Sequence, residues 1–89
     1  MRSQKNYPDQ LNLSDFPDKN LLILDDDDPL RGRLARAMEK KGFVVKEAKT
    51  VSEGLHIVKN NPPCFALVDL RLEDGNGLDV IKELSLRHI

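Results

Sequence analysis

The chain has 89 residues, of which 39% are hydrophobic and 33% are charged, and its 14 Lys and Arg nearly balance its 15 Asp and Glu. A chain of this length forms one small domain at most, and its composition excludes a wholly disordered protein. The formal net charge of -1 excludes a whole-chain electrostatic attraction to nucleic acid or to an anionic membrane, so we expect neither partner.

The features that report cellular location favour the cytoplasm. The single cysteine, Cys64, excludes an internal disulfide and a cysteine metal cluster, and we expect it to be a small buried side chain at the start of a strand. No apolar run approaches the length of a membrane-spanning helix, and the first residues lack the apolar core of a signal peptide. We therefore expect a cytoplasmic protein.

Residues 1–18 are predicted to form a flexible N-terminal arm. This stretch is polar, carries two prolines and shows neither helical nor alternating hydrophobic periodicity. Its few apolar residues, Leu11, Leu13 and Phe16, offer a surface that can dock on a neighbour.

The folded part is predicted to begin at Lys19. An apolar run over Leu21–Leu24 is typical of a strand buried on both faces of a parallel sheet. Asp28 is the expected N-cap of the following helix, with Pro29 at its first position and Gly42 as its stop. We expect the inward face of this helix to consist of Leu30, Leu34, Ala37 and Met38.

A second strand and helix follow. The stretch over residues 43–48 is rich in β-forming residues but includes two charged ones, which favours an edge strand. Thr50 and Glu53 form a capping box that begins a helix ending near Lys59. We expect Val51, Leu55 and Val58 to point inward.

The third apolar run covers residues 64–69 and ends on Asp69. A loop over "LRLEDGNG" then leads to a third helix, which begins near Asn76 or Gly77 and has Leu78, Ile81 and Leu84 as its apolar stripe. Strands alternate with helices throughout. The sequence therefore predicts an α/β fold with right-handed crossovers and a parallel sheet covered by helices on both faces.

Two of the three predicted strands end on aspartates. Ligands bind outside the carboxyl ends of strands in open parallel sheets, so Asp25, Asp26 and Asp69 converge if the first and third strands are neighbours. Their mutual repulsion is relieved by a divalent cation, and hard oxygen ligands favour Mg²⁺. We expect the backbone carbonyl of Arg71 to complete this site.

A cation held by carboxylates suits phosphoryl transfer. An aspartate attacks phosphorus when a metal ion screens the repulsion between the two anions. Asp69 is the better nucleophile candidate, because it stands alone at its strand end while Asp25 and Asp26 come as a pair.

Two stretches of the sequence, "LLILDDDDPL" and "VDLRLEDGNGLDVI", resemble the receiver domain of two-component response regulators, particularly those of the RegA/PrrA/ActR type. The resemblance covers residues 19–89 and implies a flavodoxin-like sheet with the strand order 2-1-3. It also implies that Asp25 and Asp26 bind Mg²⁺, that Asp69 accepts a phosphoryl group from a histidine kinase, and that Arg71 adds its carbonyl. One departure from the usual receiver pattern is Glu73, where many members have proline.

The resemblance also implies parts that these 89 residues do not include. A complete receiver has five strand-helix units, with a Thr or Ser after the fourth strand and a Lys after the fifth. We therefore expect a partial receiver whose phosphorylation is weak, without a DNA-binding output domain. The third strand would have an open outer edge, and we expect the chain to cover this edge by self-association, by its own arm or by a partner.

Two other functions stay open. One is a structural interaction protein whose acceptor site does not react. The other is a phosphatase resembling the haloacid dehalogenases, since Asp25 and Asp27 are spaced as in their nucleophile motif. That motif expects Thr or Val where Pro29 stands, which weakens the second alternative.

Overall fold

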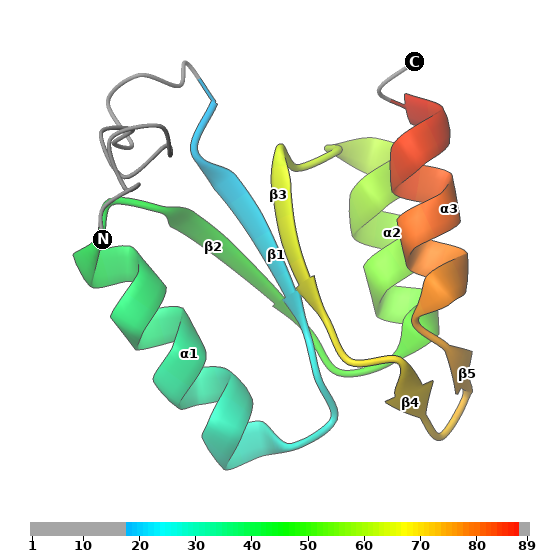
Figure 1. Ribbon diagram of the computed structural model, residues 1–89, viewed down its shortest axis with the longest axis horizontal. Helices are drawn as coiled ribbons and strands as arrows, with labels where there is room; N and C mark the ends of the chain where they lie inside the picture. Colours follow the sequence, from blue (N-terminus) through cyan, green and yellow to red (C-terminus); the bar gives the residue numbers. More distant parts are fainter. Residues whose placement is uncertain (1–17, 88–89) are drawn as a thin grey trace, which may run out of the picture.

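The computed structural model describes residues 18–87, which form a parallel sheet with helices on both of its faces (Figure 1). Three strands in the order β2-β1-β3 make the sheet: β1 (Asn20–Leu24), β2 (Val44–Ala48) and β3 (Phe65–Val68). The predicted fold class, the strand order and the edge position of β2 are confirmed. The predicted arm lies outside the described residues except for Asp18, whose carboxylate accepts two hydrogen bonds from Asn20.

Strand β1 lies at the centre of the sheet and divides the core into two parts. All four residues of Leu21–Leu24 are at most 3% exposed. Leu21 and Ile23 belong to the apolar cluster on the α1 side, while Leu22 and Leu24 belong to the cluster on the side of α2 and α3. Successive side chains of a strand point to opposite faces, so one uninterrupted apolar run supplies both clusters.

Helix α1 (Asp28–Lys40) begins one residue earlier than the sequence predicts. Its N-cap is Asp27, whose side chain accepts a hydrogen bond from the backbone N–H of Leu30 at 3.0 Å. The predicted cap, Asp28, is therefore wrong: it lies in the first turn and pairs with Arg31 at 2.7 Å. Either aspartate has an oxygen suited to capping, and only the backbone conformation of Asp27, which is extended, decides between them.

The inward face of α1 also differs from the prediction by one position. Ala35 is buried and Ala37 is exposed, while Leu34 and Met38 pack against the buried cluster as expected. Ala35 belongs to the buried cluster that also contains Leu21 and Ile23 of β1.

Two helices cover the other face of the sheet, α2 (Val51–Asn60) and α3 (Leu78–Arg87). The predicted cap of α2 is confirmed, because the Thr50 hydroxyl accepts from the backbone N–H of Glu53 at 3.0 Å. In α3 the fully buried residue is Val80, whereas Leu78 and Ile81 are 43% and 37% exposed. The predicted stripe of α3 is thus wrong at two of its three positions.

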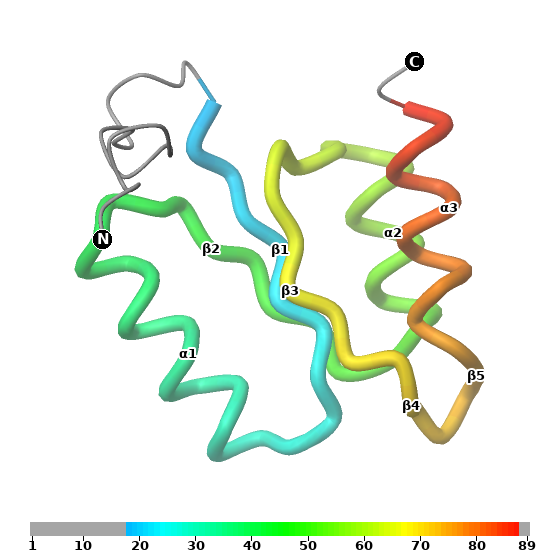
Figure 2. The backbone as a smooth tube through the Cα atoms, viewed as in Figure 1, coloured from blue at the N-terminus to red at the C-terminus, as the bar shows by residue number. Residues whose placement is uncertain are grey.

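The predicted loop after Asp69 contains a small antiparallel hairpin, β4 (Arg71–Leu72) and β5 (Gly75–Asn76). Figure 2 shows the chain leaving β3, turning through this hairpin and entering α3 beside the start of α2. The hairpin sets where α3 begins, and this explains why the helix phase could not be deduced from the apolar spacing alone.

Strand β3 is the outermost strand of the described sheet on its side. Leu67 is 40% exposed, and Cys64, expected to be buried, is exposed. Helix α1 packs over β1 and β2 and leaves part of β3 uncovered (Figure 1). Among residues 18–87 no helix is long and apolar enough to cross a membrane.

Candidate functional site

Three carboxylates meet at the carboxyl ends of β1 and β3. Asp25 and Asp26 follow β1, Asp69 follows β3, and each offers a ligand oxygen, with all three oxygens within 4.8 Å of one another. The two strands are parallel neighbours, and the Asp69 N–H donates to the carbonyl of Leu24 at 2.8 Å. The structure therefore brings together the three side chains that the sequence predicts as metal ligands.

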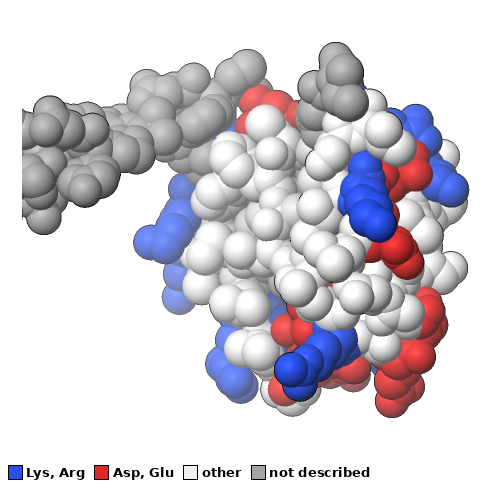
Figure 3. Space-filling model, turned by 45° about the vertical axis from the view of Figure 1, so that its right-hand side comes forward, with Lys and Arg blue, Asp and Glu red and all other residues white. Residues whose placement is uncertain are grey.

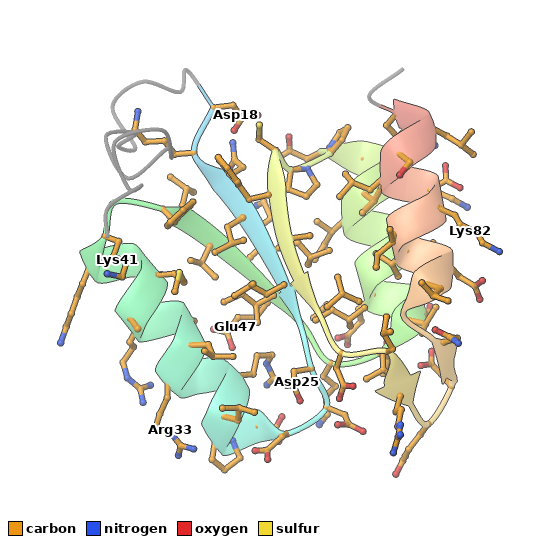
Figure 4. The ribbon with its side chains drawn as sticks, in the orientation of Figure 1. Asp18, Asp25, Arg33, Lys41, Glu47 and Lys82 are labelled. Carbon is orange, nitrogen blue, oxygen red and sulfur yellow. The ribbon has the colours of Figure 1, made fainter. Side chains whose placement is uncertain are left out.

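The backbone and the side chain of Asp25 are both held in place. Its N–H donates to the carbonyl of Ala48 at 3.0 Å, and its carboxylate accepts from the N–H of Asp27 at 2.9 Å. Its own carbonyl accepts from the Arg31 guanidinium at 2.7 Å. Figure 4 labels Asp25 at the lower end of β1, where the chain turns toward α1.

Arg31 ties this turn to the neighbouring strand. Besides the carbonyl of Asp25, its guanidinium binds the carboxylates of Asp28 at 2.7 Å and Glu47 on β2 at 3.0 Å. The hydrogen bond from Arg31, together with the positive charge of Lys49, lowers the pKa of Asp28. Asp28 therefore supports the turn behind the carboxylate cluster and does not belong to it.

Asp27 also lies outside the cluster. Its carboxylate caps α1, and the group of possible ligands in the described part of the chain consists of Asp25, Asp26 and Asp69. Dehalogenase-like chemistry needs Asp25 and Asp27 at one site, so the geometry does not support that alternative.

The loop after Asp69 orients the Asp69 side chain. The N–H of Arg71 donates to Oδ1 of Asp69 at 3.0 Å, which fixes the carboxylate, while the Arg71 side chain is exposed. Gly77 closes the loop by donating its N–H to the carbonyl of Leu70 at 3.2 Å. The carbonyl of Arg71 as a metal ligand stays a prediction.

Sequence reasoning missed one residue of this region, Asp74. It lies at the tip of the hairpin, and its two oxygens accept from the backbone N–H groups of Val51 at 2.8 Å and Ser52 at 3.1 Å. These two bonds lower the pKa of the Asp74 carboxyl. The stretch "EDGNG" by itself indicates only a flexible turn. The partners of Asp74 lie more than twenty residues earlier in the chain, so no local pattern reveals them.

A hollow of about 360 Å³ lies beside the carboxylate cluster. Its lining consists of Asp26, Lys49, Thr50, Glu73 and Asp74. Figure 3 shows acidic side chains gathered toward the lower edge of one face of the molecule. Three clustered carboxylates beside a hollow that Glu73 and Asp74 also line fit a hard divalent cation that keeps part of its water shell, as Mg²⁺ does.

Comparison with known proteins agrees with this geometry. Residues 21–88 match the family model for the response regulator receiver domain. The chain is 57% identical over 70 residues to the photosynthetic apparatus regulatory protein RegA of Cereibacter sphaeroides, covering 79% of this chain and 38% of RegA. It is 56% identical over 71 residues to the acid tolerance regulatory protein ActR of Rhizobium meliloti, covering 80% and 37%. A further relative is the KDP operon transcriptional regulatory protein KdpE of Escherichia coli, 37% identical over 65 residues, covering 73% and 29%.

Solved structures give the same result. A response regulator from Burkholderia pseudomallei, determined with a phosphorylated aspartic acid, calcium ion and citrate, superposes with a TM-score of 0.70 at 37% identity, covering 75% of this chain and 39% of that one. The HemR receiver domain from Leptospira biflexa superposes with a TM-score of 0.68 at 33% identity, covering 75% and 54%. The chain thus spans well under half the length of its curated relatives. The match over residues 21–88 and the shared fold show that this chain belongs to the response regulator receiver family.

Proposed function

We propose that this chain is a phosphoacceptor module of a two-component system, in which Asp69 takes a phosphoryl group from a sensor histidine kinase. The observation that carries the proposal is the meeting of Asp25, Asp26 and Asp69 within 4.8 Å at the ends of two adjacent parallel strands. Membership of the receiver family supports it, since accepting phosphate from such kinases is a general property of receivers.

The proposed metal site consists of the three carboxylates and the main-chain carbonyl of Arg71. Receiver domains typically bind Mg²⁺ through acidic residues, and the cluster of Asp25, Asp26 and Asp69 has the same chemistry. When bound, the ion supplies charge neutralisation between the carboxylates and the phosphoryl oxygens.

The residues of the chain orient the reacting carboxylate. The hydrogen bond from the Arg71 N–H to Oδ1 of Asp69 fixes the orientation of the carboxylate that would attack phosphorus. An O–P bond to Asp69 forms while the P–N bond to the kinase imidazole breaks. The electron pair of the broken bond stays on the imidazole nitrogen, which takes up a proton.

For the 89-residue chain itself we propose slow and incomplete phosphorylation. In complete receivers a lysine after the fifth strand contacts the phosphoryl group, so a sample of these 89 residues by themselves would compensate less of the transferred charge. The chain would be a regulator that accepts phosphate and not an enzyme in the usual sense. In a longer protein, it would serve transcription regulation, as the KDP operon transcriptional regulatory protein KdpE does by its name.

We also propose that the 89-residue chain self-associates along β3. Within residues 18–87 this strand pairs with β1 alone, and Leu67 on it is 40% exposed. A strand at the outer edge of a sheet promotes association with a second chain.

Intact-mass measurement tests the phosphoacceptor function. The wild-type chain is incubated with Mg²⁺ and a small phosphoramidate, and we expect a partial mass gain of one phosphoryl group. Asp69→Asn should abolish the gain, because the amide oxygen is too weak a nucleophile. The matched control is Asp79→Asn, which removes the same charge from an exposed position in the first turn of α3.

Each alternative gives a different result. A gain that persists in Asp69→Asn and disappears in Asp25→Asn would assign the nucleophile to Asp25 and contradict the proposal. No gain in the wild type, even with its kinase as donor, would favour the interaction protein without a reactive site.

A further inference from the structure

The hairpin after Asp69 is attached to a second element of the fold through Asp74. Its carboxylate accepts one hydrogen bond each from the N–H groups of Val51 and Ser52, the first two residues of α2. The Thr50 hydroxyl accepts from the next free amide, that of Glu53. A helix leaves its first N–H groups without partners inside the helix, and here the adjacent Thr50 and the distant Asp74 accept hydrogen bonds from them.

A short and continuous set of contacts connects Asp74 with Asp69. Arg71 and Leu72 pair with Asn76 and Gly75, respectively, across the hairpin. At the near end of the hairpin, the N–H of Arg71 holds the Asp69 carboxylate at 3.0 Å. The loop therefore has one end at the phosphoacceptor and its tip on α2.

The hairpin has little stability of its own. Its strands have two residues each, and isolated two-stranded hairpins are at best marginally stable in water. Gly75 has a φ of 150°, and a Cβ added at this position would lie 3.5 Å from the side chain of Val51 on α2. Leu72 of the hairpin packs against the buried cluster, and the two hydrogen bonds of Asp74 join the tip of the hairpin to the first turn of α2.

We propose that Asp74 is a positioning residue for the carboxylate site: its contact with the start of α2 holds the hairpin so that Arg71 keeps Asp69 in its binding orientation. The expected effect of Asp74 on cation affinity rests on the proposed function. If the hairpin leaves α2 in part of the molecules, the apparent affinity for a cation falls in proportion to the competent fraction. Conversely, a cation bound at Asp69 stabilises the first turn of α2, because coupling between two sites is reciprocal.

Loss of negative charge alone also weakens cation binding, so the test needs a variant that separates charge from contact. Glu73 is the neighbour of Asp74 on the same exposed turn and lines the same hollow. Within residues 18–87 it takes part in no hydrogen bond or ion pair. Glu73→Gln therefore removes the same charge as Asp74→Asn and leaves the attachment to α2 intact.

The experiment is an NMR titration of the ¹⁵N-labelled 89-residue chain with Mg²⁺, for wild type, Asp74→Asn and Glu73→Gln. In metal-free Asp74→Asn we expect shifted Val51 and Ser52 amide signals and faster solvent exchange of the Arg71 amide. The Mg²⁺ affinity of this variant should fall about tenfold, as is typical when a supporting residue of a metal site is removed. Glu73→Gln should change the affinity by less than about twofold, as expected for an exposed charge screened by salt. Equal affinities and equal Arg71 exchange in the two variants would overturn the inference.

A second measurement needs no variant and covers the case in which Asp74→Asn does not fold. Saturating Mg²⁺ should slow the solvent exchange of the Val51 and Ser52 amides in the wild type, although neither residue belongs to the carboxylate cluster. Unchanged exchange at both amides would contradict the coupling.

The two proposals fail separately. If the wild type neither binds Mg²⁺ nor gains mass, the phosphoacceptor function is wrong, and the Arg71 exchange in metal-free protein still decides the role of Asp74. If the wild type binds Mg²⁺ and Asp74→Asn matches Glu73→Gln, only the role of Asp74 is wrong.

Discussion

Gly77 lies where the chain leaving the hairpin passes closest to Asp69. A Cβ at this position would overlap the carbonyl oxygen of Asp69 and come within 2.6 Å of a methyl group of Val68. Gly77 has no positive φ, so the requirement for glycine is one of space and not of backbone conformation. The sequence alone suggests a flexible turn, while the structure shows a close approach of two backbone segments.

We predict that Gly77→Ala displaces Asp69 and damages the carboxylate site. Overpacking against a backbone atom should lower the free energy of unfolding by about 1–3 kcal/mol. The Mg²⁺ affinity should fall about tenfold or more, because the ligand oxygens move apart. Urea unfolding and the NMR titration measure the two effects.

Gly32→Ala is the control for this substitution. Gly32 lies inside α1, and the atom nearest to its added Cβ is the far end of the Arg36 side chain at 3.4 Å. Alanine is favoured over glycine inside a helix, so this variant should gain about 0.5–1 kcal/mol of stability. A Gly77→Ala variant that is as stable and binds Mg²⁺ as well as the wild type would show that no close approach exists.

At the scale of the elements, α3 shows how a helix can be predicted correctly and oriented wrongly. The periodicity of its apolar residues indicates a helix. Several rotations of that helix about its own axis, however, would turn apolar residues toward the core. The structure buries Val80 completely, and Val80 forms one cluster with Leu24 and Val58 while Leu84 packs against it. The hairpin that precedes α3 fixes its start at Leu78 and thereby its phase.

We predict that Val80→Ala lowers the free energy of unfolding by about 2 kcal/mol, from the lost burial of two methyl groups and the cavity left behind. Ile81→Ala removes a larger group from a neighbouring position that is 37% exposed, and should cost less than about 1 kcal/mol. Urea unfolding of both variants measures the difference. If Ile81→Ala proves the more destabilising of the two, the orientation of α3 in the structure is contradicted.

At the scale of the whole molecule, the sheet is covered unequally. Helix α1 packs on β1 and β2, and the face of β3 that carries Leu67 receives less cover (Figure 1). This uneven cover and the outer edge of β3 are the basis for the proposed self-association.

We predict that the 89-residue chain sediments with a concentration-dependent mass, and that Leu67→Lys shifts it toward the monomer. A lysine on an edge strand disfavours pairing with a second chain. Val44→Lys is the control, since Val44 is 56% exposed on β2 at the opposite edge of the sheet. Analytical ultracentrifugation at several concentrations measures the effect, and a wild type that stays monomeric throughout would contradict the proposal.

The amino-acid sequence by itself determined the order of strands and helices, the edge character of β2, the cap of α2 and the three carboxylates of the site. These features depend on local patterns: an apolar run, a capping pair, and aspartates that follow directly on two strands. Because parallel neighbouring strands end at the same edge of a sheet, Asp25, Asp26 and Asp69 could be placed together from the sequence once the strand order was expected.

Only the tertiary structure decided the cap of α1, the phase of α3, the exposure of Cys64 and the attachment of Asp74 to α2. Each depends on a choice between nearly equivalent local solutions, or on a contact between segments far apart in the chain. Asp27 and Asp28 have the same side chain, and Asp74 gains its role from two amides more than twenty residues away. Tertiary packing settles such choices, because the neighbouring elements determine which local arrangement buries apolar side chains and gives the backbone N–H and C=O groups their hydrogen-bond partners.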